Sequence, residues 1–159
     1  IGTAGAVAKD VRPGDLVVAS ASVANEGTSR HYLNGDVYSA VADYEVTRAL
    51  ADQAAASQLP DHVGLIQTDD GFYAASQGDV PEMEARGVLA VEMEASALFL
   101  LGKLRGVRTG CMLATSNNLG DSSFVEKSVL DNAVKEMIRT TLEACVELHG
   151  RGLTEGGVR

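Results

Sequence analysis

Two carboxylates flank a methionine within residues 87–102, where a β-forming apolar run meets an apolar helical run. The side chains of Glu92 and Glu94 share a side of an extended chain, but on a helix they diverge by about 200°. One acid at the start of a helix is expected as a cap, because it lies at the positive end of the helix dipole. A second acid beside Met93, between apolar residues, needs a polar partner or a ligand. Capping and contact with sugar hydroxyls, with the methionine against the apolar face of the sugar, are both open interpretations.

Polar side chains also lie at the end of another apolar run and near the amino terminus. Ser116 and Asn117 follow the apolar run that starts at Thr109, where they either cap a helix or contact a ligand. Gly2 and Thr3 offer backbone N–H groups and a hydroxyl to an anion, because glycine leaves the backbone accessible. A tight turn is the alternative for this glycine-rich start. Both segments are candidate binding elements.

Phe72 and Tyr73 are two of only seven aromatic residues in the chain, which has three Phe, four Tyr and no Trp. They follow the predicted strand at residues 62–68 in a polar loop. In that position they either form a stacking wall for a planar ligand or pack into the core beneath the loop.

The histidines and cysteines show no spacing typical of a catalytic triad or a metal site, so we expect no metal. His62 is expected to begin a strand, and His149 to end a helix, where a cationic side chain is favourable. Cys111 and Cys145 each lie in an apolar pattern and are expected to be buried, reduced thiols.

Composition indicates one globular domain of 159 residues with 45% hydrophobic residues and a net charge of −9. This charge argues against non-specific binding to nucleic acid or to an anionic membrane, since both are polyanions. No apolar run approaches the roughly 18 residues of a membrane helix, and there is no signal-peptide pattern. We therefore expect a cytoplasmic protein, and the absence of an initiator Met suggests a segment of a longer one.

Hydrophobic periodicity predicts strands that alternate with helices, an α/β arrangement with a parallel or mixed sheet. Ligands of such sheets gather at the carboxyl ends of strands. Residues 24–36 read as a loop, a short amphipathic piece surrounds Met83, and residues 150–159 read as a flexible tail after a domain of residues 1–149. The predicted strands cover residues 15–23, 62–68, 87–91 and 109–116, and the predicted helices cover residues 41–57, 92–104 and 125–146.

The segment GVLAVEMEASALFLLGKLRGVRTG resembles the nucleoside phosphorylase family that contains uridine phosphorylase and the hexameric purine nucleoside phosphorylases. IGTAGAV, VRPGDLVVASASV, AVADYEV and FY also follow the order of that family, so the resemblance covers residues 1–148, the later two-thirds of a typical member. It implies a three-layer α/β/α sandwich with a mixed, partly barrel-like central sheet, here without its N-terminal portion. It also implies a homo-oligomer, dimeric or hexameric, with phosphate as co-substrate and no cofactor.

The resemblance also assigns roles to individual residues. It implies that Thr3, with Gly2, contacts phosphate, that Met93 packs on the sugar, and that Glu94 accepts hydrogen bonds from ribose hydroxyls. Glu92 belongs to the same motif and is expected to line the ribose site. The residues implied near the base and its leaving nitrogen are Phe72, Tyr73, Ser116, Asn117 and Gln77.

The departures from the family pattern concern phosphate and base. The family's phosphate-binding arginine immediately precedes Ile-Gly-Thr, whereas this chain begins at Ile1, so we expect it to be inactive alone. Asn117 stands where purine-specific members have an Asp general acid, and an amide cannot donate a proton in that way. Uridine phosphorylases carry Asn there, but their Gln-x-Arg pair is absent, with Gln77 the nearest candidate.

The sequence therefore predicts a pentosyltransferase that converts a ribonucleoside and phosphate to free base and ribose 1-phosphate, with uridine slightly favoured over a purine nucleoside. A purine nucleoside phosphorylase is the first alternative. A non-catalytic homologue that binds a nucleoside or serves as a subunit interface is the second. A hydrolytic nucleosidase ranks last, since it needs a general acid that Asn117 does not provide.

Overall fold

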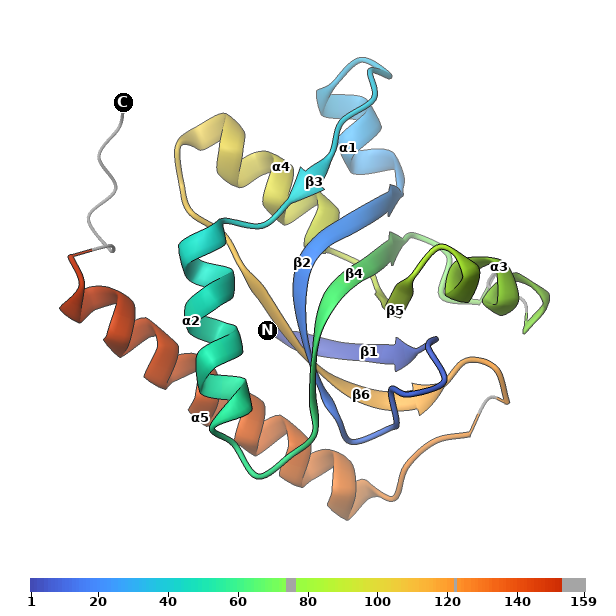
Figure 1. Ribbon diagram of the computed structural model, residues 1–159. Helices are drawn as coiled ribbons and strands as arrows, with labels where there is room; N and C mark the ends of the chain where they lie inside the picture. The colour runs from blue at the N-terminus through green and yellow to red at the C-terminus, as the bar shows by residue number, and fades with distance from the viewer. Residues whose placement is uncertain (74–76, 122, 153–159) are drawn as a thin grey trace.

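Six strands form a mixed sheet in the computed structural model of Figure 1, which describes residues 1–73, 77–121 and 123–152. The neighbours in the sheet run in the order β3, β2, β4, β5, β1, β6. The strands are β1 (Gly2–Ala6), β2 (Leu16–Asn25), β3 (Ala40–Val41), β4 (Asp61–Asp69), β5 (Val88–Glu92) and β6 (Cys111–Asn118). The helices are α1 (Gly27–Tyr32), α2 (Tyr44–Ala55), α3 (Val80–Ala85), α4 (Ala95–Arg105) and α5 (Lys127–Gly150), with a 3₁₀ turn η1 (Gln77–Asp79) before α3.

The strand pairing closes on itself, because β2 pairs with β6 as well as with β4. The pairs β2–β4, β4–β5 and β1–β6 are parallel, whereas β1–β5, β2–β6 and β2–β3 are antiparallel. A ring of so few strands leaves a narrow interior that small side chains fill. Small residues on several strands of the ring belong to the same buried cluster, among them Ala4, Ala6, Ala19 and Ala90. The predicted α/β class and mixed sheet are confirmed.

Helices cover the sheet on more than one side (Figure 1). The helices α2 and α5 pack against each other and against the faces of β2 and β6 that carry Leu16, Val18 and Met112. Helix α4 inserts the fully buried Phe99 into the other main cluster, and α1 contacts α4. Met83 of α3 packs with Val88 of β5 in a third, smaller cluster. This layering is consistent with the predicted α/β/α sandwich.

Most predicted elements are present, and their boundaries differ where local caps decide them. Residues 24–36 were expected as a loop but contain α1, whose first turn is capped by the Glu26 carboxylate accepting from Ser29 N–H. Residues 2–6 form the strand β1, not only a turn. Helix α4 begins at Ala95 instead of residue 92, because Glu92 is still paired with Thr68 at the end of β5.

The two cysteines differ in environment. Cys111 is buried in the core as predicted, and burial raises the pKa of its thiol to about 12. Cys145 is exposed, so the expectation that it is buried is wrong. It lies in α5 near Leu142 and Val146, which are exposed as well, so the apolar residues of this helix extend beyond the face that packs against the sheet and α2.

None of the helices in the described ranges combines the length and apolar character that a membrane crossing requires. Residues 153–159, most of the predicted tail, lie outside the described part of the chain.

Candidate functional site

Strand β1, which carries Gly2 and Thr3, lies between the two strands that end in the Glu-Met-Glu motif and in Ser116 and Asn117. It pairs antiparallel with β5, with Gly5 opposite Val91 and Ala6 opposite Ala90. On its other side β1 runs parallel to β6, with Gly5 opposite Asn117. Two strand spacings, about 10 Å, therefore separate the Glu-Met-Glu motif from the end of β6. The mixed sheet brings these segments together across β1 and not at one common edge.

Glu92 is buried, with 6% of its surface exposed, and both of its carboxylate oxygens are engaged. Oε2 accepts hydrogen bonds from the backbone N–H groups of Glu94 and Ala95, each at 2.8 Å. Oε1 accepts a hydrogen bond from the Thr68 hydroxyl at 2.5 Å. The negative charge therefore lies at the amino end of α4, where unpaired N–H groups and the helix dipole stabilise it. The sequence left helix capping and contact with sugar hydroxyls open for the two acids, and the hydrogen bonds of Glu92 agree with helix capping.

Glu94, in contrast to Glu92, is exposed. It occupies the position before the first residue of α4, yet its side chain makes no capping hydrogen bond. Its carboxylate also has no hydrogen bond to another described residue, so its oxygens are available as acceptors. Met93 between the two acids is 40% exposed. The two acids therefore differ in environment: Glu92 is buried and holds the turn through its hydrogen bonds, whereas Glu94 and Met93 are exposed.

A buried polar network supports this turn, and the sequence did not reveal it. Thr68 on β4 accepts a hydrogen bond from Ser96 N–H at 2.9 Å, and its hydroxyl lies 2.7 Å from Ser22 Oγ. The Ser96 hydroxyl donates to Glu26 Oε1 at 2.9 Å. Alternation of polar and apolar residues along β2 and β4 could have signalled Ser22 and Thr68, but no local pattern points to Ser96 or Glu26, which lie outside these strands.

Burial acts to raise the pKa of Glu26, but hydrogen bonds from Ser29 and Ser96 outweigh it and hold that pKa below the usual value. Glu26 is therefore a stably ionised carboxylate inside the protein. It joins the first turn of α1 to the first turn of α4.

Asn117 and Ser116 form a half-buried pair at the end of β6. The Ser116 hydroxyl lies 2.9 Å from Asn117 Oδ1 and 3.3 Å from the carbonyl oxygen of Ala4. When Ser116 donates to Oδ1, the Asn117 amide is oriented with its NH₂ group as the free donor. A donor in this place fits an acceptor atom on a base.

The aromatic pair Phe72 and Tyr73 is exposed, at 67% and 97%, so it does not pack in the core. The two rings stack edge to face with centroids 5.0 Å apart. Asp69 shapes the loop that carries them by accepting from Gly71 N–H at 2.8 Å, and Asp70 joins it to α1 by accepting from Gly27 N–H at 2.7 Å. The structure is consistent with the stacking-wall interpretation and not with core packing.

Gln77 begins η1, and its side chain lies outside the described part of the chain. Thr3 is exposed beside the half-exposed Gly2. Within the described ranges, no three His, Cys, Asp or Glu side chains gather in a way that could hold a metal ion.

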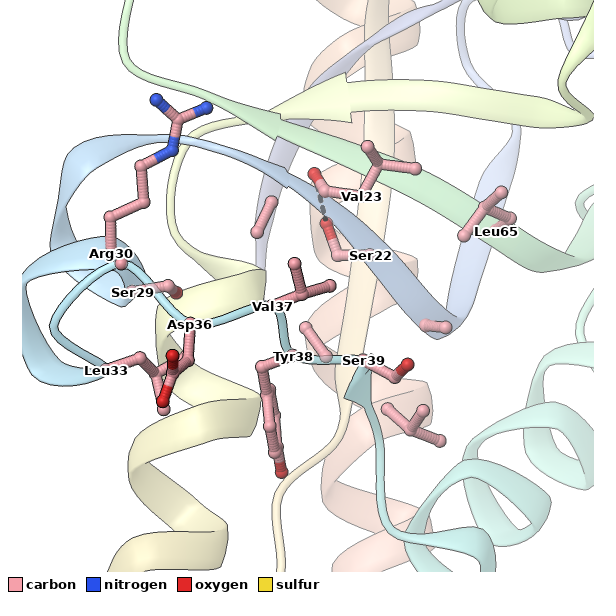
Figure 2. Close-up of a pocket in the computed structure, with 15 residues that line it drawn as sticks. Ser22, Val23, Ser29, Arg30, Leu33, Asp36, Val37, Tyr38, Ser39 and Leu65 are labelled. Atoms are coloured by element: carbon pink, nitrogen blue, oxygen red, sulfur yellow. Dashed lines mark hydrogen bonds between the residues drawn. The ribbon is translucent and has the colours of Figure 1, made fainter.

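A separate cavity of about 610 Å³ lies between β2, α1 and β3. Figure 2 shows Val23 and Leu65 on its strand side and Val37 and Tyr38 on its loop side. None of the predicted site residues lines it, although Ser22 connects it to the buried network through Thr68.

Comparison with known proteins gives one consistent family. A family model described as "Phosphorylase superfamily" matches residues 1–147. The chain is 36% identical to a guanosine phosphorylase of Halorubrum lacusprofundi over 92% of this chain and 64% of the relative. It is 33% identical to a uridine phosphorylase of Thermococcus kodakarensis, over 78% of this chain and 49% of the relative. It is also 28% identical to a DeoD-type purine nucleoside phosphorylase of Shewanella amazonensis, over 93% of this chain and 63% of the relative.

The chain thus spans about half to just under two-thirds of the length of these relatives. The family match covers β1, the Glu-Met-Glu turn and the end of β6, the three segments that the fold brings together. The chain belongs to the phosphorylase superfamily.

Proposed function

We propose that this chain carries the nucleoside-binding part of a nucleoside phosphorylase. The observation that carries the proposal is the division between Glu92 and Glu94: one carboxylate is consumed by the fold, and the other is exposed, without a partner in the described residues, beside an exposed Met93. An unpaired carboxylate next to an apolar surface is complementary to a ribose, which has vicinal hydroxyls and an apolar face. The names of the three relatives support the same class of reaction.

In the proposed reaction, phosphate attacks C1′ of the ribosyl group while the bond from C1′ to the base nitrogen breaks. The products are ribose 1-phosphate and the free base. Positive charge develops on the ribosyl group in the transition state, and the Glu94 carboxylate, bound to its hydroxyls, stabilises that charge and fixes the orientation of the sugar. Thr3 is exposed on β1, and we propose that its hydroxyl contacts phosphate and ribose.

The base is proposed to lie between the aromatic pair and the end of β6. Phe72 supplies a stacking surface, and the Asn117 NH₂ donates to an acceptor on the base as its bond to the sugar breaks. Uridine is our first candidate, because Asn117 offers a hydrogen bond without a transferable proton. A purine nucleoside is the second candidate, favoured by the 36% identity to a guanosine phosphorylase.

We also propose that the functional protein is a homo-oligomer. Two observations support this: the resemblance of the sequence to the nucleoside phosphorylase family, and the exposure of the aromatic side chains of Phe72 and Tyr73 on the surface of the single chain. Sedimentation velocity would test this, and a purely monomeric protein at micromolar concentration would contradict it. The expectation that the 159 residues alone are inactive stays a prediction.

Phosphate-dependent release of base from uridine, guanosine and inosine, followed by chromatography with the full-length natural protein, tests the activity. We expect base release that requires phosphate and falls sharply in Glu94→Gln. Release without phosphate would indicate hydrolysis instead. No product from any of the three nucleosides would refute the enzymatic proposal, and calorimetry with nucleoside, with and without phosphate, would then distinguish a non-catalytic binder.

A further inference from the structure

The Thr68 hydroxyl is the centre of the buried network beneath the candidate ribose site. Thr68 is fully buried on β4. Its Oγ1 lies within hydrogen-bonding distance of three groups from three other segments: Glu92 Oε1 at 2.5 Å, Ser22 Oγ at 2.7 Å and Ser96 N at 2.9 Å. No solvent competes for these contacts, so the proton on each group can be assigned from its chemistry.

Only one assignment of donors and acceptors around Thr68 Oγ1 is consistent with the chemistry of its partners. A backbone N–H only donates, so Thr68 accepts from Ser96, and an ionised carboxylate only accepts, so the single Thr68 proton goes to Glu92. The remaining lone pair of Thr68 Oγ1 accepts the proton of Ser22, because Thr68 Oγ1 lies 2.7 Å from Ser22 Oγ and the alternative acceptor, the Val23 carbonyl oxygen, lies 3.4 Å away. Thr68 thereby makes one donated and two accepted hydrogen bonds, the full capacity of a hydroxyl.

This arrangement fixes both oxygens of Glu92. Thr68 holds Oε1, which leaves Oε2 directed at the N–H groups of Glu94 and Ala95. The same Thr68 oxygen also anchors the next N–H of the turn, that of Ser96. Three successive backbone N–H groups at the start of α4 are therefore held by two side chains, Glu92 and Thr68.

We propose that Thr68 is a positioning residue of the nucleoside site: it holds the turn from which Met93 and Glu94 project, without touching the ligand. The inference rests on the proposed function for its ligand, but its structural part concerns this chain alone. Without the Thr68 hydroxyl, Glu92 Oε1 and Ser96 N–H lose their partner while buried, and the carboxylate turns toward another donor. The sugar-binding side chains then lose their fixed spacing.

The test uses three variants of the full-length natural protein. Thr68→Val removes the hydroxyl at nearly constant volume, and Thr68→Ser restores it. Thr140→Val is the matched control, because Thr140 is also fully buried but its hydroxyl has no hydrogen-bond partner in the described part of the chain. We expect Thr68→Val to raise the KM for nucleoside about tenfold or more with the KM for phosphate unchanged, and the other two variants to stay within about twofold of wild type.

A second measurement is independent of activity. Amide hydrogen exchange should be about tenfold or more faster at Glu94, Ala95 and Ser96 in Thr68→Val, and unchanged in the core of α5. If Thr68→Val does not fold, Thr68→Cys, whose thiol is a weaker donor, should show the same changes at smaller size. Unchanged exchange at the three amides, equal effects on both KM values, or failure of Thr68→Ser to restore them would overturn the proposal. Faster exchange at these amides in Thr68→Val, together with no phosphorolysis by the wild-type protein, would support the positioning of the turn and refute the proposed reaction.

Discussion

The backbone N–H of Glu94 donates a hydrogen bond to Oε2 of Glu92 at 2.8 Å, so the buried acid of the Glu-Met-Glu motif fixes the exposed one. This contact explains why two charges lie at the edge of the core. One charge satisfies the amino end of α4, and the other is exposed on the turn that the first one shapes, where we propose that it binds ribose.

Glu94→Gln is expected to weaken nucleoside binding about 10- to 100-fold, because an amide replaces a charged acceptor of the ribose hydroxyls. The free energy of unfolding should not change, since this side chain is exposed and makes no hydrogen bond to a described residue. Calorimetry with nucleoside and thermal unfolding together measure both effects. Loss of stability with unchanged affinity would mean that the carboxylate is structural.

Phe72→Ala should lower nucleoside affinity about tenfold by removing a stacking surface, in line with the loss of about 1–3 kcal/mol typical of base stacking on aromatic residues. Because the ring is two-thirds exposed, at 67%, the melting temperature should stay the same. Phe72→Tyr is the control that keeps the ring and should bind as wild type. A melting temperature that drops in Phe72→Ala would show that the ring packs against the protein instead.

Asn117→Asp is expected to raise kcat/KM for guanosine or inosine relative to uridine by at least about tenfold, because a carboxylic acid can protonate a leaving purine. The Ser116 hydroxyl, 2.9 Å from Asn117 Oδ1, can donate to the new carboxylate in the same place. The steady-state rates for the three nucleosides measure the change. An equal loss of activity for all of them would argue that Asn117 does not contact the base.

Acid should destabilise the protein partly through Glu26. Its pKa in the folded protein is lower than the unfolded value near 4.5, so its contribution to stability is complete above that value and is lost as the pH falls through the folded-state pKa. Urea unfolding between pH 3 and 7 should therefore show a shallower acid limb for Glu26→Gln than for wild type. Identical slopes would contradict this assignment.

Gly102→Ala tests how closely helix α4 packs against the segment of Val107 and Thr109 at Gly102. An added Cβ would lie 2.5 Å from Thr109 Cγ2 and 2.9 Å from the carbonyl oxygen of Val107, so we expect a loss of about 1–3 kcal/mol in unfolding free energy. Gly150→Ala, with no atom within 4 Å of its added Cβ, is the control and should be neutral or stabilising by up to about 1 kcal/mol. Equal denaturant midpoints for the two variants would contradict the packing.

Much of the fold could be predicted from the sequence because its signals are local. Apolar runs with β-branched residues mark β2 and β4, and helix formers after Asp43 mark α2, which that residue caps. The short helix α1 was missed, because its six residues carry no apolar period and are held by the Glu26 cap.

The sequence by itself determined the family, the alternation of strands and helices, and the Glu-Met-Glu motif as the candidate site. Only the tertiary structure decided which carboxylate is buried and which is exposed, that β2 pairs with β6 to close the ring, and that Thr68 and Ser96 support the turn. The physical reason is that burial and hydrogen bonding depend on partners far away in the chain. Thr68 and Glu92 are separated by 24 residues, and the spacing of residues along one segment carries no information about such a contact.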